Sequence, residues 1–443
     1  MNYFGGATSI ETLLIFPITP LRMKNVAVIG LGYVGLPLAC LAAEKGIKVT
    51  GIDIDKNKIA LLKKSESPIK DEALASSIKK YHTKINFSHN FEDIKNAEVI
   101  IVCVPTPVDD RHMPDLKPLI SACTSIAPHF AANSLIVIES TIFPGTVEEI
   151  VQPIFEKTKK PFLLSHCPER IDPGNKKFGI NNLPRVVGGI NTEATKKTAD
   201  FYRSLIDVPV LELSSVKAAE ATKIMENTFR DINIAFINEM AMSFDKAGID
   251  IMEVIKGAST KPFAFMPHYP GIGVGGHCIP VDPYYLIEKA KQIGFNHEFL
   301  SLARQINNNM PHYTFSLLET EMKKLNAKIQ GAKIGILGIA YKANVDDTRE
   351  SPSLKIIELL KQKKAEVMVY DPYVPSLSTC KSIAELLAQS DYIILATDHV
   401  QFTKIPASEF KKNGIRIIID GKNCLDKEAI KKERILYHGI GRF

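Results

Sequence analysis

The sequence predicts an α/β protein in which two doubly wound, Rossmann-like domains are joined by a central domain with a long helix. Two observations support this fold class. Short apolar runs rich in β-branched residues recur at helix-length intervals in both halves of the chain, which is typical of buried parallel strands that alternate with helices. Between the halves, residues 217–248 contain no proline and a single glycine, at the end, and their apolar residues recur at helical spacing.

The first half alternates predicted strands and helices. A β-rich run at 25–29 precedes a predicted helix at 35–46, and a second strand is expected at 48–52. Further strands are expected at 98–104 (EVIIVCV), 135–139 (LIVIE) and 162–165. Because these runs are almost continuously apolar, we expect a parallel sheet covered by helices on both faces.

The second half repeats the alternation after the long helix. A segment rich in glycine and proline runs from 262 to 283, and strands are expected at 333–338 (KIGILG), 366–370 (EVMVY), 391–396 (DYIILA) and 415–419 (IRIII). The repetition is architectural, since no short-period repeat occurs. We therefore expect an N-terminal extension (1–22), a first Rossmann-like domain (23–214), a central helical and dimerisation domain (215–312) and a second Rossmann-like domain (313–443).

Composition narrows the class of protein. The 55 basic and 49 acidic residues give a net charge of +6 and are scattered, so nucleic-acid binding is not expected. Seven cysteines without a Cys-x-x-Cys pair favour a reducing, cytoplasmic location over a disulfide framework or a metal site. No apolar run approaches the roughly 20 residues that span a bilayer. Residues 10–18 lack the basic start and cleavage site of a signal peptide, and Met23, just before the first strand, is an alternative start.

A dinucleotide-binding motif opens the first domain. Gly30, Gly32 and Gly35 form G-x-G-x-x-G between a predicted strand and a predicted helix. In this motif the first glycine allows a tight turn, the second lets the backbone approach a pyrophosphate, and the third lets the helix pack on the strand. Asp53 ends the next strand and is expected to bind the ribose hydroxyls, so that its charge favours NAD over NADP. The other expected cofactor contacts are Tyr33, Val34, Pro105, Thr106, Thr141 and Lys58. The positive charges of Lys56 and Lys58 near Asp53 leave NADP open as an alternative cofactor.

A candidate nucleophile, Cys278, lies in the segment GVGGHCIPVD at 273–282. Three glycines just before the cysteine would let a ligand and the backbone come close to the sulfur, and Asp282 follows one helical turn later. A thiolate needs nearby positive charge or hydrogen-bond donors. His277 is a less favoured base, because adjacent residues point apart. For Cys40, Cys103 and Cys123 we expect the ordinary role of a buried small hydrophobe.

Seven motifs occur in one order along the chain: IGLGYVGLP, VCVPTP, ESTIFPGT, CPERIDPG, EATKIMEN, GVGGHCIPVD and GIAYKANVDDTRESPS. In these motifs the chain, from Lys24 onward, resembles the nucleotide-sugar 6-dehydrogenases of the UDP-glucose/GDP-mannose dehydrogenase superfamily. The resemblance implies that two NAD⁺ oxidise the C6 alcohol of a UDP-sugar to a carboxylate, through a thiohemiacetal and a thioester on the cysteine. A covalent adduct of this kind holds the carbon that a free aldehyde would lose to solvent.

The resemblance also implies a role for each matching residue. Cys278 matches the nucleophile, Lys223 stabilises the developing alkoxide, Asn227 lies on the same helical face, Thr141 and Asp282 handle water and proton, and Glu169 serves in hydrolysis. The second Rossmann-like domain keeps Gly335 and Gly338 but lacks a full phosphate fingerprint, so a second dinucleotide is not expected. The resemblance assigns this domain to the uridine diphosphate, with Lys342 and Arg349 as contacts, and adds Arg170 and Gly275 to the expected substrate contacts.

One departure from the family bears on the substrate. UDP-glucose dehydrogenases of the family carry a second glutamate four residues after the Pro-Glu pair, where this chain has Pro173. The segments ERIDPGNKKF and STKPFAFMPHYPG resemble the branch acting on UDP-N-acetylglucosamine, which serves surface-polysaccharide synthesis. UDP-glucose and UDP-N-acetylmannosamine remain alternatives, as does an inactive nucleotide-binding protein. Arg230 is either a sugar contact or a surface arginine, and the apolar face of the long helix suits a homodimer or a higher homo-oligomer.

Overall fold

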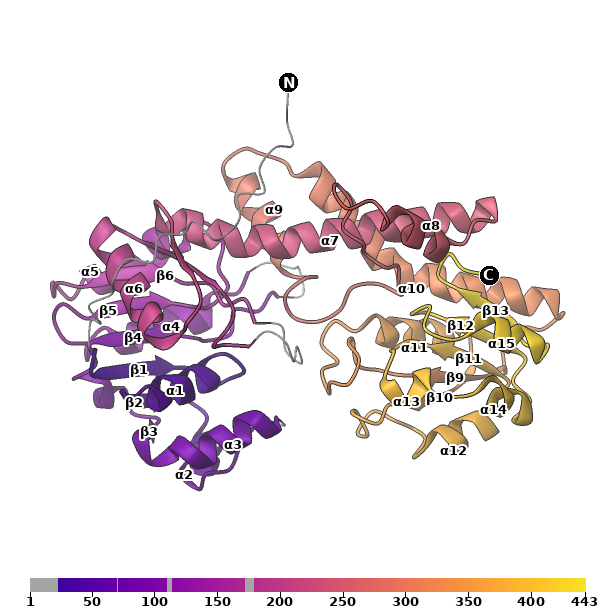
Figure 1. The fold of residues 1–443 in the computed structure, drawn as a ribbon, viewed down its shortest axis with the longest axis horizontal. Coiled ribbons are helices and arrows are strands. Elements are labelled where there is room, and N and C mark those ends of the chain that lie inside the picture. Colours follow the sequence, from indigo (N-terminus) through magenta and orange to yellow (C-terminus); the bar gives the residue numbers. More distant parts are fainter. Residues whose placement is uncertain (1–22, 70, 110–113, 172–178) are drawn as a thin grey trace. The chain divides into compact units, whose positions relative to one another are not determined.

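The computed structural model describes residues 23–69, 71–109, 114–171 and 179–443, so the predicted extension at 1–22 and Pro173 lie outside the described residues. The chain divides into two compact units, one ending at Met225 and the other beginning at Glu226 (Figure 1). The expected domain boundaries at 214/215 and 312/313 stay a prediction.

The first unit contains a sheet of eight strands in the order β3-β2-β1-β4-β5-β6-β7-β8. Its strands are β1 (Asn25–Ile29), β2 (Lys48–Ile52), β3 (Ile85–Ser88), β4 (Val99–Val102), β5 (Leu135–Ile138), β6 (Leu163–His166), β7 (Arg185–Gly189) and β8 (Val210–Glu212). All neighbouring strands are parallel except β6 and β7. This is the doubly wound order, with its topological switch between β1 and β4. The expected parallel sheet is confirmed, and β3, β7 and β8 are additions that the sequence pattern did not predict.

Helices cover both faces of this sheet because its strands are apolar on both sides. Val26 and Val28 of β1 pack into one hydrophobic cluster with α1 and α6, whereas Ala27 and Ile29 pack into a second cluster with α4. The helices of the unit are α1 (Gly35–Glu44), α2 (Lys56–Lys63), α3 (Glu72–Tyr81), α4 (Lys117–Ile126), α5 (Gln152–Glu156) and α6 (Thr192–Leu205), with short helical turns η2 (His82–Lys84), η3 (Phe91–Ile94) and η4 (Val147–Val151).

The predicted long helix is α7 (Val216–Ala247), and the division between the units falls within it. The second unit continues with α8 (Ile251–Ala258), α9 (Asp282–Gln292) and α10 (Glu298–Lys324). Its parallel sheet has the order β10-β9-β11-β12-β13, with β9 (Lys333–Leu337), β10 (Glu366–Tyr370), β11 (Tyr392–Leu395), β12 (Ile417–Asp420) and β13 (Leu436–Gly439). The remaining helices are α11 (Pro352–Gln362), α12 (Ile383–Ala388), α13 (Val400–Thr403), α14 (Ala407–Lys412) and α15 (Lys427–Lys432). The second doubly wound sheet is thus confirmed, with β13 as a further strand.

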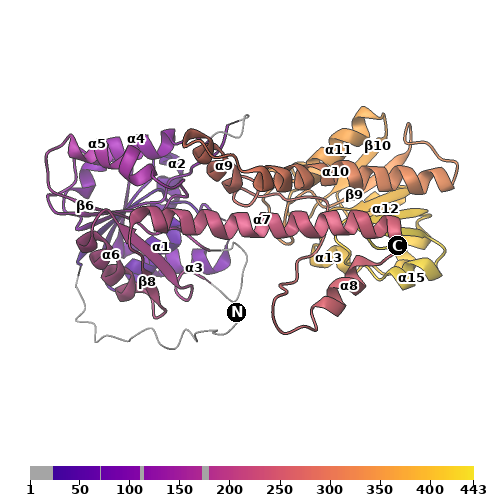
Figure 2. The same cartoon turned by 90° about the horizontal axis from the view of Figure 1, so that it is seen from above.

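A buried polar network fastens α7 to α10, which run side by side in the second unit (Figures 1 and 2). Arg304 of α10 donates to Asp231 of α7 at 2.6 Å, and Asn307 donates to the same carboxylate at 2.8 Å. Asn238, two turns along α7, donates to Asn307 and accepts the backbone N–H of Gly271. The network therefore also fixes Gly271, within the glycine- and proline-rich segment that leads to Cys278.

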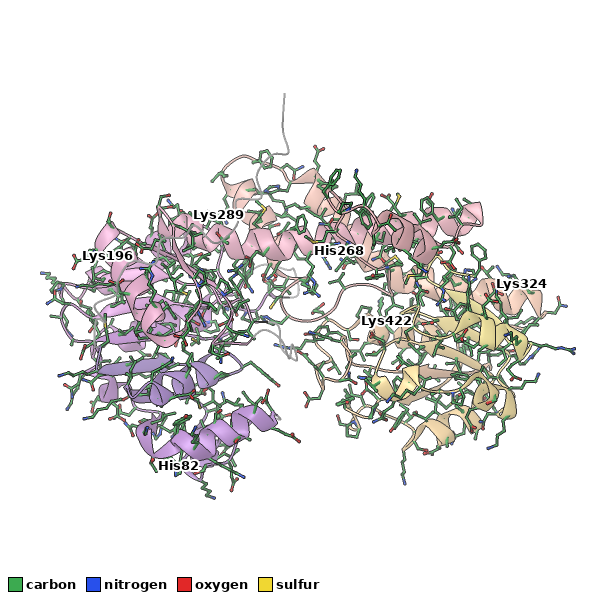
Figure 3. All side chains as sticks on the ribbon, in the orientation of Figure 1. His82, Lys196, His268, Lys289, Lys324 and Lys422 are labelled. Carbon is green, nitrogen blue, oxygen red and sulfur yellow. The ribbon has the colours of Figure 1, made fainter. Side chains whose placement is uncertain are left out.

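Charged side chains such as Lys196 of α6 and Lys324 of α10 project from the surface (Figure 3). Among the described helices, none is both long and apolar enough to cross a lipid bilayer.

His438 of β13 lies buried between two carboxylates of the second unit. Its ring nitrogens are 2.8 Å from Asp245 of α7 and 2.9 Å from Glu321 of α10. Burial alone lowers the pKa of His438, but the hydrogen bonds to both carboxylates outweigh it and raise that pKa to about 9. The imidazolium therefore joins the last strand to both long helices.

We predict that His438→Gln destabilises the second unit most at low pH. A histidine whose pKa rises from 6.5 to about 9 on folding contributes about 3 kcal/mol, which is complete below pH 6.5 and is lost as the pH rises through 9. Denaturant unfolding between pH 6 and 10 should show the gap to wild type closing over this interval. His312→Gln, at an exposed position of α10, is the control. A gap that does not change with pH would contradict the assignment.

Candidate active site

The turn after β1 has the shape that a dinucleotide requires. Gly30 has a φ of +91°, and a Cβ there would lie 2.6 Å from the carbonyl oxygen of Cys103. A Cβ on Gly35 would lie 2.0 Å from the carbonyl oxygen of Gly30, so helix α1 starts in tight contact with the strand. A Cβ on Gly32 would meet nothing within 4 Å. The first and third glycines are thus required by the protein itself, and the second leaves open space where a pyrophosphate can approach.

Asp53, at the end of β2, faces this turn. Its buried carboxylate accepts the backbone N–H of Leu31 at 2.9 Å and the Lys58 ammonium at 2.6 Å. The first bond fixes the turn, and the second offsets part of the negative charge. These residues fit NAD: an acidic side chain stands beside the glycine turn, as ribose binding needs.

The loops after β4 and β5 meet at the same edge of the sheet. The Thr106 hydroxyl donates to the carbonyl oxygen of Thr141 at 2.7 Å, and the Ser140 hydroxyl donates to that of Val104 at 2.7 Å. Exposed Pro105 lies between these bonded residues. Ligands of doubly wound sheets bind at this edge, beside the switch between β1 and β4. The structure therefore places the expected cofactor contacts of the two loops next to each other.

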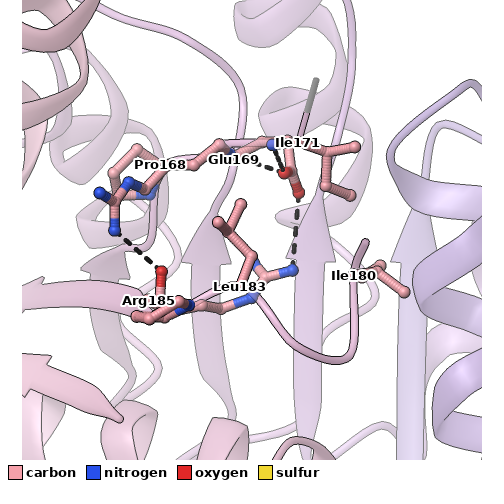
Figure 4. A pocket seen from close by; sticks show the side chains of 8 residues that line it. Pro168, Glu169, Ile171, Ile180, Leu183 and Arg185 are labelled. Atoms are coloured by element: carbon pink, nitrogen blue, oxygen red, sulfur yellow. Dashed lines mark hydrogen bonds and ion pairs between the residues drawn. The ribbon is translucent and has the colours of Figure 1, made fainter. Parts of the chain in front are cut away.

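Glu169 follows β6 and is buried (Figure 4). Its Oε1 accepts the N–H of Arg170 at 2.6 Å, and its Oε2 lies 3.5 Å from the Arg185 guanidinium. The Arg170 guanidinium donates to the carbonyl oxygen of Pro184 at 2.8 Å. Sequence reasoning missed Arg185, although an arginine at the start of a buried apolar strand is an unusual feature that could have drawn attention to it.

Lys223 is buried on α7 in the first unit. Glu220, one turn earlier, accepts the N–H groups of Gly145 at 2.6 Å and Val147 at 2.8 Å, so the start of α7 is fixed to the loop that carries Thr141. Burial, with a smaller contribution from the Lys223 charge, lowers the pKa of His166, at the end of β6, to about 3. The ring beside Lys223 is therefore neutral. The anchoring role of Glu220 was not predicted.

Cys278 is exposed and lies in the turn that leads into α9, four residues before the helix begins at Asp282. Its carbonyl oxygen accepts the N–H of Asp282 at 2.8 Å, and the buried Asp282 carboxylate accepts the Asn227 amide. The structure thus joins these three predicted residues. By contrast, burial raises the pKa of the Cys40 and Cys123 thiols to about 12, as suits buried thiols.

The glycines before Cys278 pack against protein. A Cβ on Gly275 would lie 2.6 Å from Cβ of Tyr341, and one on Gly276 would lie 2.8 Å from the Tyr341 ring. The N–H of Gly276 also donates to the carbonyl oxygen of Arg349 at 2.9 Å. We expected these glycines to admit a ligand, whereas their close neighbour in the structure is the loop after β9. The nucleophile segment and that loop therefore form one packed body.

The same loop brings charge toward the nucleophile segment. The Arg349 guanidinium bonds Asp347 at 2.6 Å, and this bond, with a smaller contribution from Cys278, raises the pKa of Arg349. Burial, followed by the charge of Arg349, lowers the pKa of His277, so that imidazole is neutral. Of these two side chains, Arg349 is therefore the one that carries a positive charge beside the nucleophile segment.

The turn after β9 repeats the first turn but is filled by the protein. Asp371 corresponds to Asp53, and its carboxylate accepts the N–H groups of Ile339 at 2.7 Å and Ala340 at 2.9 Å. His399 completes its bonding at 3.0 Å, and the carboxylate is fully buried. A Cβ on Gly338 would lie 2.4 Å from Thr397. The Asp371 carboxylate is therefore not accessible to the ribose of a second dinucleotide.

The expected site residues are divided between the two units. Thr141, Glu169, Arg170 and Lys223 belong to the first unit, and Asn227, Arg230, Gly275, Cys278, Asp282, Lys342 and Arg349 belong to the second. Arg230 is exposed on α7. Within the described ranges, no group of three or more His, Cys, Asp or Glu side chains is placed to hold a metal ion. The roles of the site residues stay predictions.

Comparison with known proteins gives three matching segments and several relatives. The chain matches the UDP-glucose/GDP-mannose dehydrogenase family in its NAD binding domain (24–206), central domain (217–309) and UDP binding domain (335–427). A Pseudomonas aeruginosa UDP-N-acetyl-D-glucosamine 6-dehydrogenase is 37% identical over 91% of this chain and 98% of its own. A Methanococcus vannielii UDP-N-acetyl-D-mannosamine dehydrogenase is 36% identical over 93% and 95%. The solved structure of a Pyrococcus horikoshii UDP-D-ManNAc dehydrogenase has a TM-score of 0.89, with 36% identity over 95% of this chain and 99% of that one.

We predict that Asp53→Ala weakens NAD⁺ binding about 10- to 100-fold and narrows the preference over NADP⁺. The variant loses hydrogen bonds to a charged group, worth about 1.5–3 kcal/mol. Calorimetric titration should give one NAD⁺ per wild-type chain, since the second turn is filled. Asp55→Ala, which removes a helix cap two residues away, is the control for general destabilisation. Equal affinity of the wild type for NAD⁺ and NADP⁺ would contradict the role of Asp53.

Proposed function

The chain belongs to the UDP-glucose/GDP-mannose dehydrogenase family and is an NAD-dependent UDP-sugar dehydrogenase; from this premise we propose that it oxidises the C6 hydroxyl of UDP-N-acetylglucosamine to a carboxylate. The observation that carries the proposal is the exposed Cys278 in the turn before α9, four residues before an Asp282 carboxylate bonded to Asn227. A thiol held there suits a reaction that must retain an aldehyde between two oxidations.

NAD⁺ bound at the turn of Gly30, Gly32 and Gly35 supplies the acceptor for one hydride in each oxidation. Lys223 stabilises the alkoxide that develops as the alcohol loses its proton, because a buried ammonium faces little competition from water. His166 supports this role, since a neutral ring beside Lys223 leaves the lysine as the positive charge.

Cys278 then acts as a nucleophile in the proposed mechanism. Its thiolate adds to the C6 aldehyde, and the resulting thiohemiacetal loses a second hydride to become a thioester. Water attacks the thioester carbonyl, the carbon–sulfur bond breaks, and the thiolate is released with the carboxylate product. We assign Glu169 to accept the proton of the attacking water, and Thr141 and Asp282 to position water and proton.

The uridine diphosphate is assigned to the loop after β9. Lys342 and Arg349 provide cations for the two phosphates, which suits their place at the switch between β9 and β11. Binding there would bring the nucleotide to the loop on which Gly275 and Gly276 pack.

UDP-N-acetylmannosamine is a second candidate substrate. Several relatives carry this sugar in their names at 35–37% identity, close to the 37% of the glucosamine enzyme. The motif ERIDPGNKKF and Pro173, which lies outside the described residues, favour an N-acetylated sugar over glucose. We therefore propose a UDP-N-acetylhexosamine as substrate, with the gluco epimer first, in the cytoplasmic synthesis of surface-polysaccharide precursors.

A homodimer is also proposed. Met225, Phe229 and Phe236 of α7 are exposed by 66%, 48% and 53%, and Phe299 of α10 is exposed by 64%. An apolar helix surface of this kind favours burial against a second copy. The oligomeric state in solution, measured by light scattering, tests this part of the proposal.

We predict two NADH and one carboxylate per sugar, with no free aldehyde. Cys278→Ala should bind both ligands but lose several orders of magnitude in turnover. Cys278→Ser should accumulate an ester adduct near one per chain, visible in the intact mass, because an ester hydrolyses more slowly than a thioester. Lys223→Ala should instead slow the first oxidation. Wild-type turnover by Cys278→Ser would refute the covalent mechanism.

We predict a kcat/KM for UDP-N-acetylglucosamine at least about tenfold above that for UDP-glucose. A site that hydrogen-bonds an acetamido group leaves polar groups unpaired with glucose, and such losses discriminate strongly. NADH formation across UDP-N-acetylglucosamine, UDP-N-acetylmannosamine, UDP-N-acetylgalactosamine and UDP-glucose measures the order. The reverse order for glucose would refute the N-acetyl assignment, and a higher value for the manno epimer would favour the second candidate.

A further inference from the structure

The guanidinium of Arg185, the first residue of β7, is buried between two carboxylates. One nitrogen lies 2.9 Å from Oε1 of Glu139 at the end of β5, and another lies 3.5 Å from Oε2 of Glu169 after β6 (Figure 4 shows the latter pair). Burial lowers the pKa of Arg185, but both carboxylates raise it, and it ends well above its usual value. Arg185 is therefore a permanent positive charge in an enclosed place.

The two oxygens of Glu169 have different surroundings. Oε1 accepts backbone N–H groups from Arg170 and Ile171. Oε2 accepts no hydrogen bond from any described residue, and Arg185 faces it at a distance longer than a good hydrogen bond. One oxygen is thus held by the backbone, while the other is oriented by charge and keeps its capacity to take a proton.

Arg185 and its partner Glu139 are also in contact with Tyr202 and two thiols. The Tyr202 hydroxyl of α6 donates to Glu139, and the Tyr202 ring centroid lies 4.8 Å from the guanidinium carbon. Two thiols complete the surroundings: Cys167 is 3.7 Å from Arg185, and Cys103 is 3.9 Å from Glu139. Burial raises the pKa of Glu139 to about 7, although Arg185 opposes the rise. The cluster thus contains one fixed cation, one carboxyl group that resists ionisation, and Glu169.

We propose that Arg185 is the positioning residue for thioester hydrolysis: it aims Oε2 of Glu169, while Glu139 and Tyr202 hold Arg185 in place. The inference rests on the hydrolytic role proposed for Glu169. In that step the oxygen of water bonds to the thioester carbon, one water proton passes to Glu169, and the bond to the sulfur of Cys278 breaks to release the thiolate.

The Arg185 guanidinium is the cation that faces Oε2 of Glu169 in the described structure. A cation beside a carboxylate favours its charged form. A variant with a neutral side chain in place of Arg185 loses this attraction, so we expect its hydrolysis step to require a higher pH. The two oxidations, assigned to Lys223 and Cys278, do not require Glu169 as a base.

The test measures the two half-reactions separately. Arg185→Gln is mixed with UDP-N-acetylglucosamine and NAD⁺ between pH 6 and 10, while NADH formation and the acyl adduct on Cys278 are followed by stopped flow and intact mass. We expect the NADH burst to persist, the thioester to accumulate, and the pH midpoint of its breakdown to rise by about one unit or more. Arg185→Lys should restore the midpoint, because it keeps the charge, at a lower rate of breakdown.

A double variant in which both charged partners are made neutral controls for misfolding of the single variant. Arg185→Gln leaves Glu139 buried without its partner, whereas Glu139→Gln with Arg185→Gln removes both charges and keeps two side chains that can bond each other. The double variant is compared with Glu139→Gln alone after both pass a thermal-melting check, and the double variant should have the higher midpoint.

Two results would overturn this inference and leave the proposed function standing. In one, the thioester forms and its breakdown keeps the wild-type midpoint in Arg185→Gln and in the double variant. In the other, burst and breakdown fall together without an adduct, as a purely structural role would give. A wild-type enzyme that releases aldehyde and forms no thioester would instead overturn the proposed function, and the inference with it.

Discussion

In each of the two sheets, an aspartate at the end of one strand accepts backbone N–H groups from the turn after the neighbouring strand. Asp53 bonds Leu31 in the first sheet, and Asp371 bonds Ile339 and Ala340 in the second. This bond fixes the loop at the switch point, where doubly wound sheets bind ligands. In the first sheet the glycine turn beside the aspartate leaves open space at Gly32, whereas His399 encloses the second aspartate. The same kind of bond thus supports the cofactor turn in one sheet and, in the other, the loop to which we assign the uridine diphosphate.

The chemistry depends on loops whose shapes are set by contacts far apart in sequence. The nucleophile segment is held by Asn238 through Gly271 and by the packing of Gly276 on Tyr341. On the first unit, Glu169 is held by its own backbone and by Arg185. In both places the reactive group stands on a segment that other parts of the protein hold in place. Surroundings held in this way keep the reacting groups in a fixed geometry through successive steps of a reaction.

The sequence predicts those parts of the fold whose signals are local. The run at 25–29, its glycine turn and the long helix follow from periodicity and turn chemistry, and the structure confirms them. The strand at 185–189 (RVVGG) escapes such reasoning because an arginine and two glycines interrupt its apolar pattern, and 210–212 is too short to carry one. The pairing of Arg185 with Glu139 spans 46 residues, so it follows from strand order rather than from any local pattern. Family resemblance named Asn227 and Asp282 separately, and the bond between them, across 55 residues, was not predicted.

The buried histidine between α7 and α10 has a consequence for the order of events during synthesis. Asp245 leaves the ribosome 193 residues before the histidine that neutralises it. At about 5–20 residues per second, the Asp245 carboxylate lacks this partner for roughly 10–40 s. The first sheet has all its strands throughout this interval, whereas the last strand of the second sheet, β13, is made only at its end. Translation speed over the 193 codons between Asp245 and His438 therefore sets how long the second unit stays incomplete.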